Sequence, residues 1–61
     1  MKELERLWRE FDRSTAWGCT QRGRPFDRAR CVEHWAAYER ALCAKYGWSE
    51  WRGPRPIGIP A

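Results

Sequence analysis

The sequence predicts an all-α fold, and three observations lead to that prediction. Residues 2–13 and 28–46 carry apolar side chains at the three-and-four spacing of one helix face. No stretch has the alternating pattern of a strand. The last nine residues contain three prolines and two glycines, which cannot continue a helix. We therefore expect one small domain over 1–61, with two antiparallel helices, a bridging loop or short helix, and an irregular C-terminal arm in which 53–61 form an extended tail.

The first predicted helix covers residues 2–13. Leu4, Leu7, Trp8 and Phe11 fall at positions i, i+3, i+4 and i+7 and form a compact apolar stripe. Charged residues occupy the remaining positions, as on the solvent face of an amphipathic helix. This stripe should pack against the second, longer helix.

The bridge between the helices has two possible structures. Ser14 or Thr15 could cap a short helix that carries Trp17. Gly18 disfavours such a helix, so a loop as far as Gly23 is the alternative. Either structure should end before Pro25, because the residue preceding a proline avoids the helical conformation.

The longer helix, 28–46, has a start and a stop that can be read from the sequence. The Asp27 carboxylate can accept hydrogen bonds from the free N–H groups of the first turn. Gly47 supplies the left-handed residue that commonly ends a helix. The predicted apolar face consists of Cys31, Val32, Trp35, Ala36, Leu42, Cys43 and Tyr46. Glu39 falls inside this face and needs a partner, which is either an Arg or indole N–H of the same chain or a basic group of a binding partner.

The residues after Gly47 should form an irregular arm. Ser49 could cap a single turn that places Trp48 and Trp51 on one side. The remaining tail should run extended, close to polyproline II. Its Ile57 and Ile59 either pack back across the helices or stay free.

The composition favours binding over catalysis. Five Trp in 61 residues are more than so small an interior can hide, so one or two should keep an exposed face of the kind enriched in interface hot spots. The net charge is +4, and four of the positive charges lie close together at Arg22, Arg24, Arg28 and Arg30. These arginines would attract an acidic protein surface or a phosphate backbone, unless they are simply a solvated loop.

Metal and enzyme chemistry are disfavoured. Cys31 and Cys43 would lie about 18 Å apart along one helix, too far to share a zinc ion. Cys19, Cys31 and His34 lack a fourth ligand, although Cys19 could form a disulfide under oxidising conditions. No second acid or His can share a substrate with Glu39, and a chain this short can hardly build an oxyanion hole. We therefore expect no metal, no cofactor and no enzymatic activity.

Two further expectations concern location. The N-terminal residues are charged and lack the apolar segment of a secretory signal. No apolar run approaches the length that spans a bilayer. The sequence therefore predicts a cytoplasmic protein that does not bind membranes.

One short string resembles a nucleic-acid-binding element. Arg22, Gly23, Arg24 and Pro25 resemble the R-G-R-P core of an AT-hook. In that family two Arg side chains lie along the narrow minor groove of A·T-rich DNA, where the negative potential attracts them. The resemblance ends at Gln21 on one side and at Phe26 on the other, where the family has proline and basic residues.

A second resemblance is one of size and style. The short, aromatic-rich chain is similar to small phage and mobile-element proteins that bind host or defence machinery, anti-CRISPR proteins among them. This resemblance implies inhibition by occluding a surface of a larger complex, and it assigns no site residues. The leading hypothesis is a non-enzymatic binding protein of this kind. Its predicted contacts are Arg22, Arg24, Arg28, Arg30, Trp17, Trp48 and Trp51. The alternatives are a small basic nucleic-acid-binding protein and a zinc-stabilised accessory domain.

Overall fold

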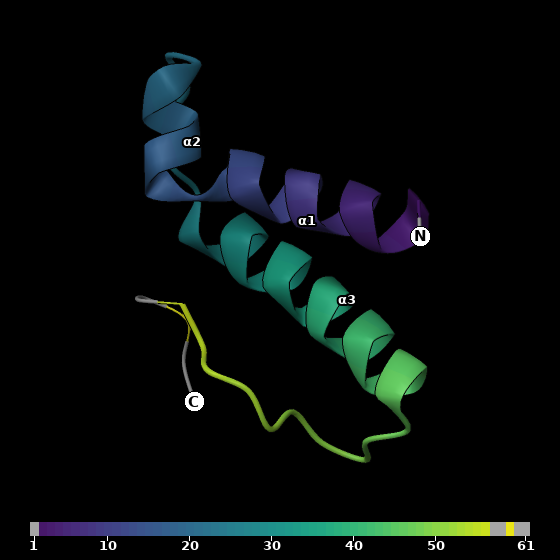
Figure 1. Ribbon diagram of the computed structural model, residues 1–61. Coiled ribbons are helices and arrows are strands. Elements are labelled where there is room, and N and C mark those ends of the chain that lie inside the picture. Colours follow the sequence, from purple (N-terminus) through teal and green to yellow (C-terminus); the bar gives the residue numbers. More distant parts are fainter. Residues whose placement is uncertain (1, 57–58, 60–61) are drawn as a thin grey trace.

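The computed structural model describes residues 2–56 and 59, and over these residues it is helical without strands. Helix α1 spans Lys2–Ser14, α2 spans Ala16–Gln21 and α3 spans Arg28–Tyr46. Figure 1 shows α1 and α3 side by side, with the chain running along them in opposite directions and α2 standing at one end. The predicted all-α class is confirmed, and both long helices have their predicted bounds to within one residue.

The ends of α3 are set by local interactions. The Asp27 carboxylate accepts a hydrogen bond from the backbone N–H of Arg30 at 3.3 Å. At the other end Gly47 adopts a left-handed conformation with φ of 73°. The backbone N–H of Trp48 then donates to the carbonyl of Cys43 at 2.9 Å, which closes the last turn. Between these caps α3 is one unbroken helix.

We expect Asp27→Ala to destabilise the fold by about 1 kcal/mol, because it removes the acceptor for the first turn of α3. For a domain of this size, that loss corresponds to a melting temperature lower by about 4–8 °C. Thermal unfolding followed by circular dichroism measures the change. Asp27→Asn keeps an oxygen acceptor and should melt close to the wild type. Equal melting of the Ala variant and the wild type would contradict the cap.

The bridge between the long helices contains a short helix rather than a loop. Thr15 is the N-cap of α2, and its hydroxyl accepts from the backbone N–H of Gly18 at 3.0 Å. Ser14 is instead the last residue of α1, where its hydroxyl donates to the carbonyl of Phe11. Gly18 does not prevent this helix; it is buried where α2 packs against the end of α1.

The core is small and aromatic. Phe11, Cys31 and Trp35 are buried, and the partly buried Tyr38, Trp51 and Ile59 pack against them. Seven rings form one contact network, each pair with centroids 5.2–6.0 Å apart, which links α1, α3 and the segment after α3. These rings are Trp8, Phe11, Trp35, Tyr38, Tyr46, Trp48 and Trp51.

Helix α1 is too short to cover the whole predicted face of α3. Its 13 residues span about 20 Å, against about 29 Å for the 19 residues of α3. The predicted face is therefore buried at Cys31 and Trp35, only partly buried at Leu42, and 56% exposed at Tyr46. Trp8 of α1 also keeps 46% of its surface exposed, although its ring contacts Phe11 and Tyr38.

The segment after Gly47 runs back along α3 (Figure 1). It has a bend at Ser49 rather than the suggested helical turn, but the Trp48 and Trp51 rings still meet, with centroids 6.0 Å apart. The Trp51 indole N–H donates to the carbonyl of Pro54 at 3.1 Å. Its ring meets that of Trp35 edge-on, with centroids 5.5 Å apart.

The arm also supplies the partner that Glu39 requires. The Arg55 guanidinium lies 3.5 Å from the Glu39 carboxylate, so the contact is made within the chain. Ile59 packs against the core, while Ile57 lies outside the described residues. In the part of the chain that the structure covers, no helix is both long enough and apolar enough to cross a membrane.

Candidate functional site

One end of the molecule is formed by α2 and the linker that follows it, residues 16–27, which we call the α2 end (Figure 1). Helix α2 packs against α1 and makes no helix–helix contact with α3. Residues 20–30 are all exposed. The α2 end therefore presents many side chains to solvent while remaining attached to the core through α1.

The α2 end holds the two aromatic side chains that the ring network leaves out. Trp17 is 70% exposed and Phe26 is 48% exposed, and neither ring contacts another aromatic ring among the described residues. Trp48 and Trp51, by contrast, are partly buried within the network. Of the three tryptophans predicted as partner contacts, Trp17 is thus the one whose side chain is mostly exposed to solvent.

The side chains of the four predicted arginines lie in different places. Arg24 and Arg30 line one cavity together, whereas Arg28 lines a separate apolar cavity of about 140 Å³. The Arg22 guanidinium turns back onto α2 and donates to the carbonyl of Gly18 at 3.2 Å. The exposed stretch around these residues is therefore not a continuous row of outward cations.

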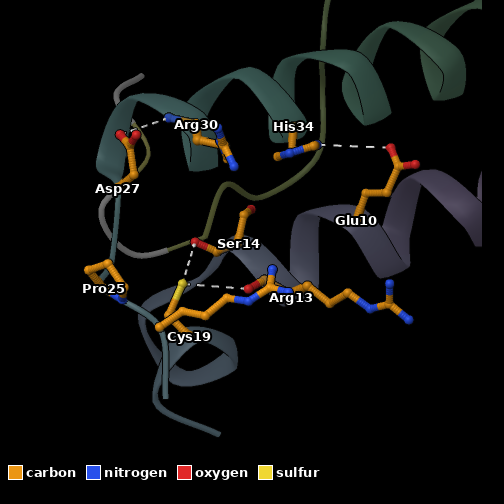
Figure 2. A pocket seen from close by; sticks show the side chains of 9 residues that line it. Glu10, Arg13, Ser14, Cys19, Pro25, Asp27, Arg30 and His34 are labelled. Atoms are coloured by element: carbon orange, nitrogen blue, oxygen red, sulfur yellow. Dashed lines mark hydrogen bonds and ion pairs between the residues drawn. The ribbon is translucent and has the colours of Figure 1, made fainter. Parts of the chain in front are cut away.

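The larger cavity, about 510 Å³, lies between α1, α2, the linker and the first two turns of α3. Figure 2 shows His34 and Arg30 projecting from α3 and Glu10 reaching up from α1. The Cys19 thiol lies on the α2 side, turned toward the end of α1 (Figure 2). We call this space the basic cavity, because Arg13, Arg24 and Arg30 all line it.

Most other polar groups of the basic cavity already have partners. The Cys19 thiol donates to the carbonyl of Arg13 at 3.6 Å and to the carbonyl of Ser14 at 3.8 Å. Glu10 binds Arg6 at 3.0 Å and lies 4.0 Å from Nδ1 of His34. Asp27 is engaged in capping α3. The acids of this cavity are therefore committed to contacts within the chain.

The three guanidinium groups of the basic cavity are not bound within the chain. Those of Arg13, Arg24 and Arg30 make no hydrogen bond or ion pair with any residue that the structure describes. A guanidinium presents several N–H donors in a planar fork that matches carboxylate and phosphate oxygens. The arrangement can therefore bind an anion.

Sequence reasoning missed Arg13 and Phe26 as candidate site residues. Arg13 is the last basic residue of α1, and nothing in the sequence places it beside Arg24 and Arg30. Only the turn of the chain through α2 brings these side chains to one cavity. Phe26, the residue at which the hook-like resemblance ends, has nearly half of its surface exposed.

The other sequence motifs have structural explanations. Gly23, in the hook-like string, has φ of 65°, and its N–H donates to the carbonyl of Thr20 at 3.3 Å. The Arg24 N–H donates to the carbonyl of Cys19 at 2.9 Å, so the string closes the end of α2 as a turn. All three cysteines are free thiols. Within residues 2–56 and 59, no group of three or more His, Cys, Asp or Glu side chains could hold a metal ion.

Over the residues that the structure describes, the chain is a small protein of three helices with a surface cavity lined by three arginines. No protein-family model, curated protein or solved structure matches this chain.

Proposed function

We propose that the chain is a non-enzymatic binding protein that docks through its α2 end on an acidic surface of a larger protein assembly and thereby occludes that surface. The observation that carries this proposal is Trp17. Its indole is 70% exposed in a chain whose other four tryptophans all pack in the ring network. Large aromatic side chains with an unused surface are the residue type that most often dominates interface energetics.

The charge of the surrounding residues supports an acidic partner. From residue 13 to residue 32 the sequence holds five arginines and a single acid, Asp27. Asp27 is engaged at the start of α3, whereas the guanidinium groups of Arg24 and Arg30 have no partner among the described residues. Complementary charge of this kind speeds encounter with an acidic surface and fixes the orientation of docking.

A protein partner is favoured over a nucleic acid by the placement of the arginines. Binding along a phosphate backbone uses a track of cations that follows the strand. Here Arg22 folds back onto α2 and Arg28 lines the apolar cavity, which leaves gaps in that track. The hook-like string is also held as a turn, with Gly23 in the left-handed conformation, rather than as an extended segment.

The proposed mode of action is that of anti-CRISPR-type inhibitors, in which a small protein covers a surface of a host or defence complex. A chain of 61 residues can act in this way because blocking requires a surface and no catalytic machinery. A standard interface buries about 800 Å² on each partner, or some 20–30 residues. The chain exposes 4855 Å² in all, so a contact of about 800 Å² would cover about a sixth of its surface.

Affinity capture from a lysate of the source cell and of its natural hosts tests the proposal. We expect the tagged chain to retain one large protein complex in fixed stoichiometry, and we expect nuclease treatment to leave the capture intact. Trp17→Ala and Arg24→Glu should each reduce the captured complex at least about tenfold, as loss of an interface hot spot does. Arg40→Glu is the matched control, since Arg40 is an exposed arginine of α3 outside the basic cavity.

Three outcomes would contradict the proposal. Capture that disappears with nuclease would assign the α2 end to nucleic acid. Capture that is insensitive to both Trp17→Ala and Arg24→Glu would place the interface elsewhere on the molecule. Equal losses for Arg24→Glu and Arg40→Glu would show that only the net charge matters.

A further inference from the structure

We infer that the basic cavity is the pocket in which the partner inserts an acidic side chain, so that an Asp or Glu carboxylate is held by the guanidinium groups of Arg24 and Arg30. This inference rests on the proposed function and deepens it, because it names the chemical group that the α2 end recognises. It is carried by the cavity itself and by the unpaired donors that line it.

The donors come from separate parts of the chain. Arg24 lies in the linker after α2, Arg30 lies in the first turn of α3, and Arg13 lies at the end of α1. The backbone N–H of Arg30 is already bound to Asp27, so its guanidinium is the part of that residue left for a ligand. A carboxylate that enters between these groups can accept several charge-assisted hydrogen bonds, which are the stronger class.

The charge of the basic cavity suits a carboxylate better than a phosphate chain. Three guanidinium groups and two carboxylates, those of Glu10 and Asp27, line the cavity, and Glu10 is also paired with Arg6, so positive charge is in excess. A single carboxylate reduces that excess. A polyphosphate or a nucleic-acid backbone would bring further negative charges close to Glu10 and Asp27, where like charges repel.

The shape of the basic cavity is also consistent with an inserted side chain. At about 510 Å³ it is larger than one carboxylate, so it can take the acidic side chain together with part of the backbone that carries it. Its lining residues come from three helices and the linker, so the donors lie on different sides of an entering side chain. A protruding acidic loop or terminus fits this shape.

Titration of the purified, ¹⁵N-labelled chain with a short oligoglutamate peptide tests the inference by NMR, with inorganic phosphate and an oligoglutamine peptide as comparison ligands. We expect saturable shifts at Cys19, Arg24, Arg30 and His34 with oligoglutamate, and none with oligoglutamine. Arg30→Gln should weaken oligoglutamate binding about tenfold, the effect of losing one charge-assisted hydrogen bond. Arg40→Gln, the control, should weaken it less than about twofold, because an exposed and distant charge is screened.

Arg24→Gln provides a second variant of the basic cavity with the same expectation, and circular dichroism verifies that each variant keeps the wild-type helix content. Equal effects of Arg30→Gln and Arg40→Gln would overturn the inference in favour of a diffuse basic surface. Phosphate that binds these residues more tightly than oligoglutamate would overturn the assignment to a carboxylate, as would the absence of shifts with oligoglutamate.

The titration uses only the purified chain, so its failure is distinguishable from failure of the proposed function. Peptide binding in the basic cavity without capture of a protein complex would support the carboxylate pocket and contradict the proposed docking on a larger assembly. Capture that depends on Trp17, together with no binding of oligoglutamate, would support the docking and contradict the carboxylate pocket.

Discussion

Trp35→Ala should remove a large part of the stability of the fold. Trp35 is 5% exposed and contacts Phe11 of α1, Tyr38 of α3 and Trp51 of the arm, so it is the side chain that joins all three parts of the core. Truncation of a buried aromatic residue to Ala costs about 3–5 kcal/mol, through lost burial and the cavity left behind. A chain of 61 residues has a total stability of only about 3–9 kcal/mol.

Circular dichroism during urea unfolding measures this effect, and Trp17→Ala is the matched control. It removes the same atoms from a residue that is 70% exposed, so its free energy of unfolding should stay within about 0.5 kcal/mol of the wild type. The control also establishes that Trp17→Ala used in the capture experiment is folded. Equal unfolding midpoints for the two Ala variants would contradict the core described for Trp35.

Trp35→Phe should be far milder than Trp35→Ala. The Trp35 Nε1 is buried and has no hydrogen-bond partner among the described residues. Phe removes this unpaired donor, whose burial is unfavourable, while it keeps an aromatic ring against Phe11 and Trp51. We expect the free energy of unfolding of the wild type and of the Phe variant to exceed that of the Ala variant. This comparison separates loss of packing from loss of the N–H group.

Gly18→Ala should also destabilise the protein strongly, although a Gly-to-Ala change inside a helix usually stabilises it. Replacing Gly by Ala inside a helix normally stabilises it by about 0.5–1 kcal/mol. At Gly18 a Cβ atom would lie 2.1 Å from the carbonyl oxygen of Asp12 and 3.0 Å from backbone atoms of Arg13. Because these neighbours are backbone, α2 must move away from α1, and overpacking of this kind costs about 1–3 kcal/mol or more.

Urea unfolding again gives the free energy, and Gln21→Ala is the control because Gln21 is an exposed residue of the same helix. We expect a loss of at least about 1 kcal/mol for Gly18→Ala and a change within about 0.5 kcal/mol for Gln21→Ala. A stabilised Gly18→Ala protein would show that α2 does not pack on α1 as described. Displacement of α2 would also move Trp17 and Cys19, so the variant should weaken both proposed binding activities.

Several features of the fold could be predicted from short stretches of sequence. The bounds of α3 depend on Asp27 at its start and Gly47 at its end, and each acts through hydrogen bonds within a few residues. The apolar stripe of α1 was likewise visible as a periodicity. For the bridge, the sequence does not decide between loop and helix, because Gly18 disfavours a helix locally. In the structure the packing of Gly18 against α1 requires a residue without Cβ.

The candidate site could be predicted only in part. Sequence reasoning selected Arg24, Arg30 and Trp17, which the structure places in the basic cavity or on an exposed face of the α2 end. It treated Arg22 and Arg28 as equivalent to them, although one bonds back to Gly18 and the other lines a different cavity. Direction of a side chain depends on the local turn of the backbone, which the spacing of charges does not reveal.

What the sequence determined by itself was the helical class and the positions at which the long helices begin and end, because caps and periodicity act between neighbours along the chain. The tertiary structure alone decided which rings enter the network, that Arg55 is the partner of Glu39, and that Arg13 joins Arg24 and Arg30 around one cavity. Those contacts join residues distant in sequence. They exist only because α1, α2 and α3 pack in one particular arrangement.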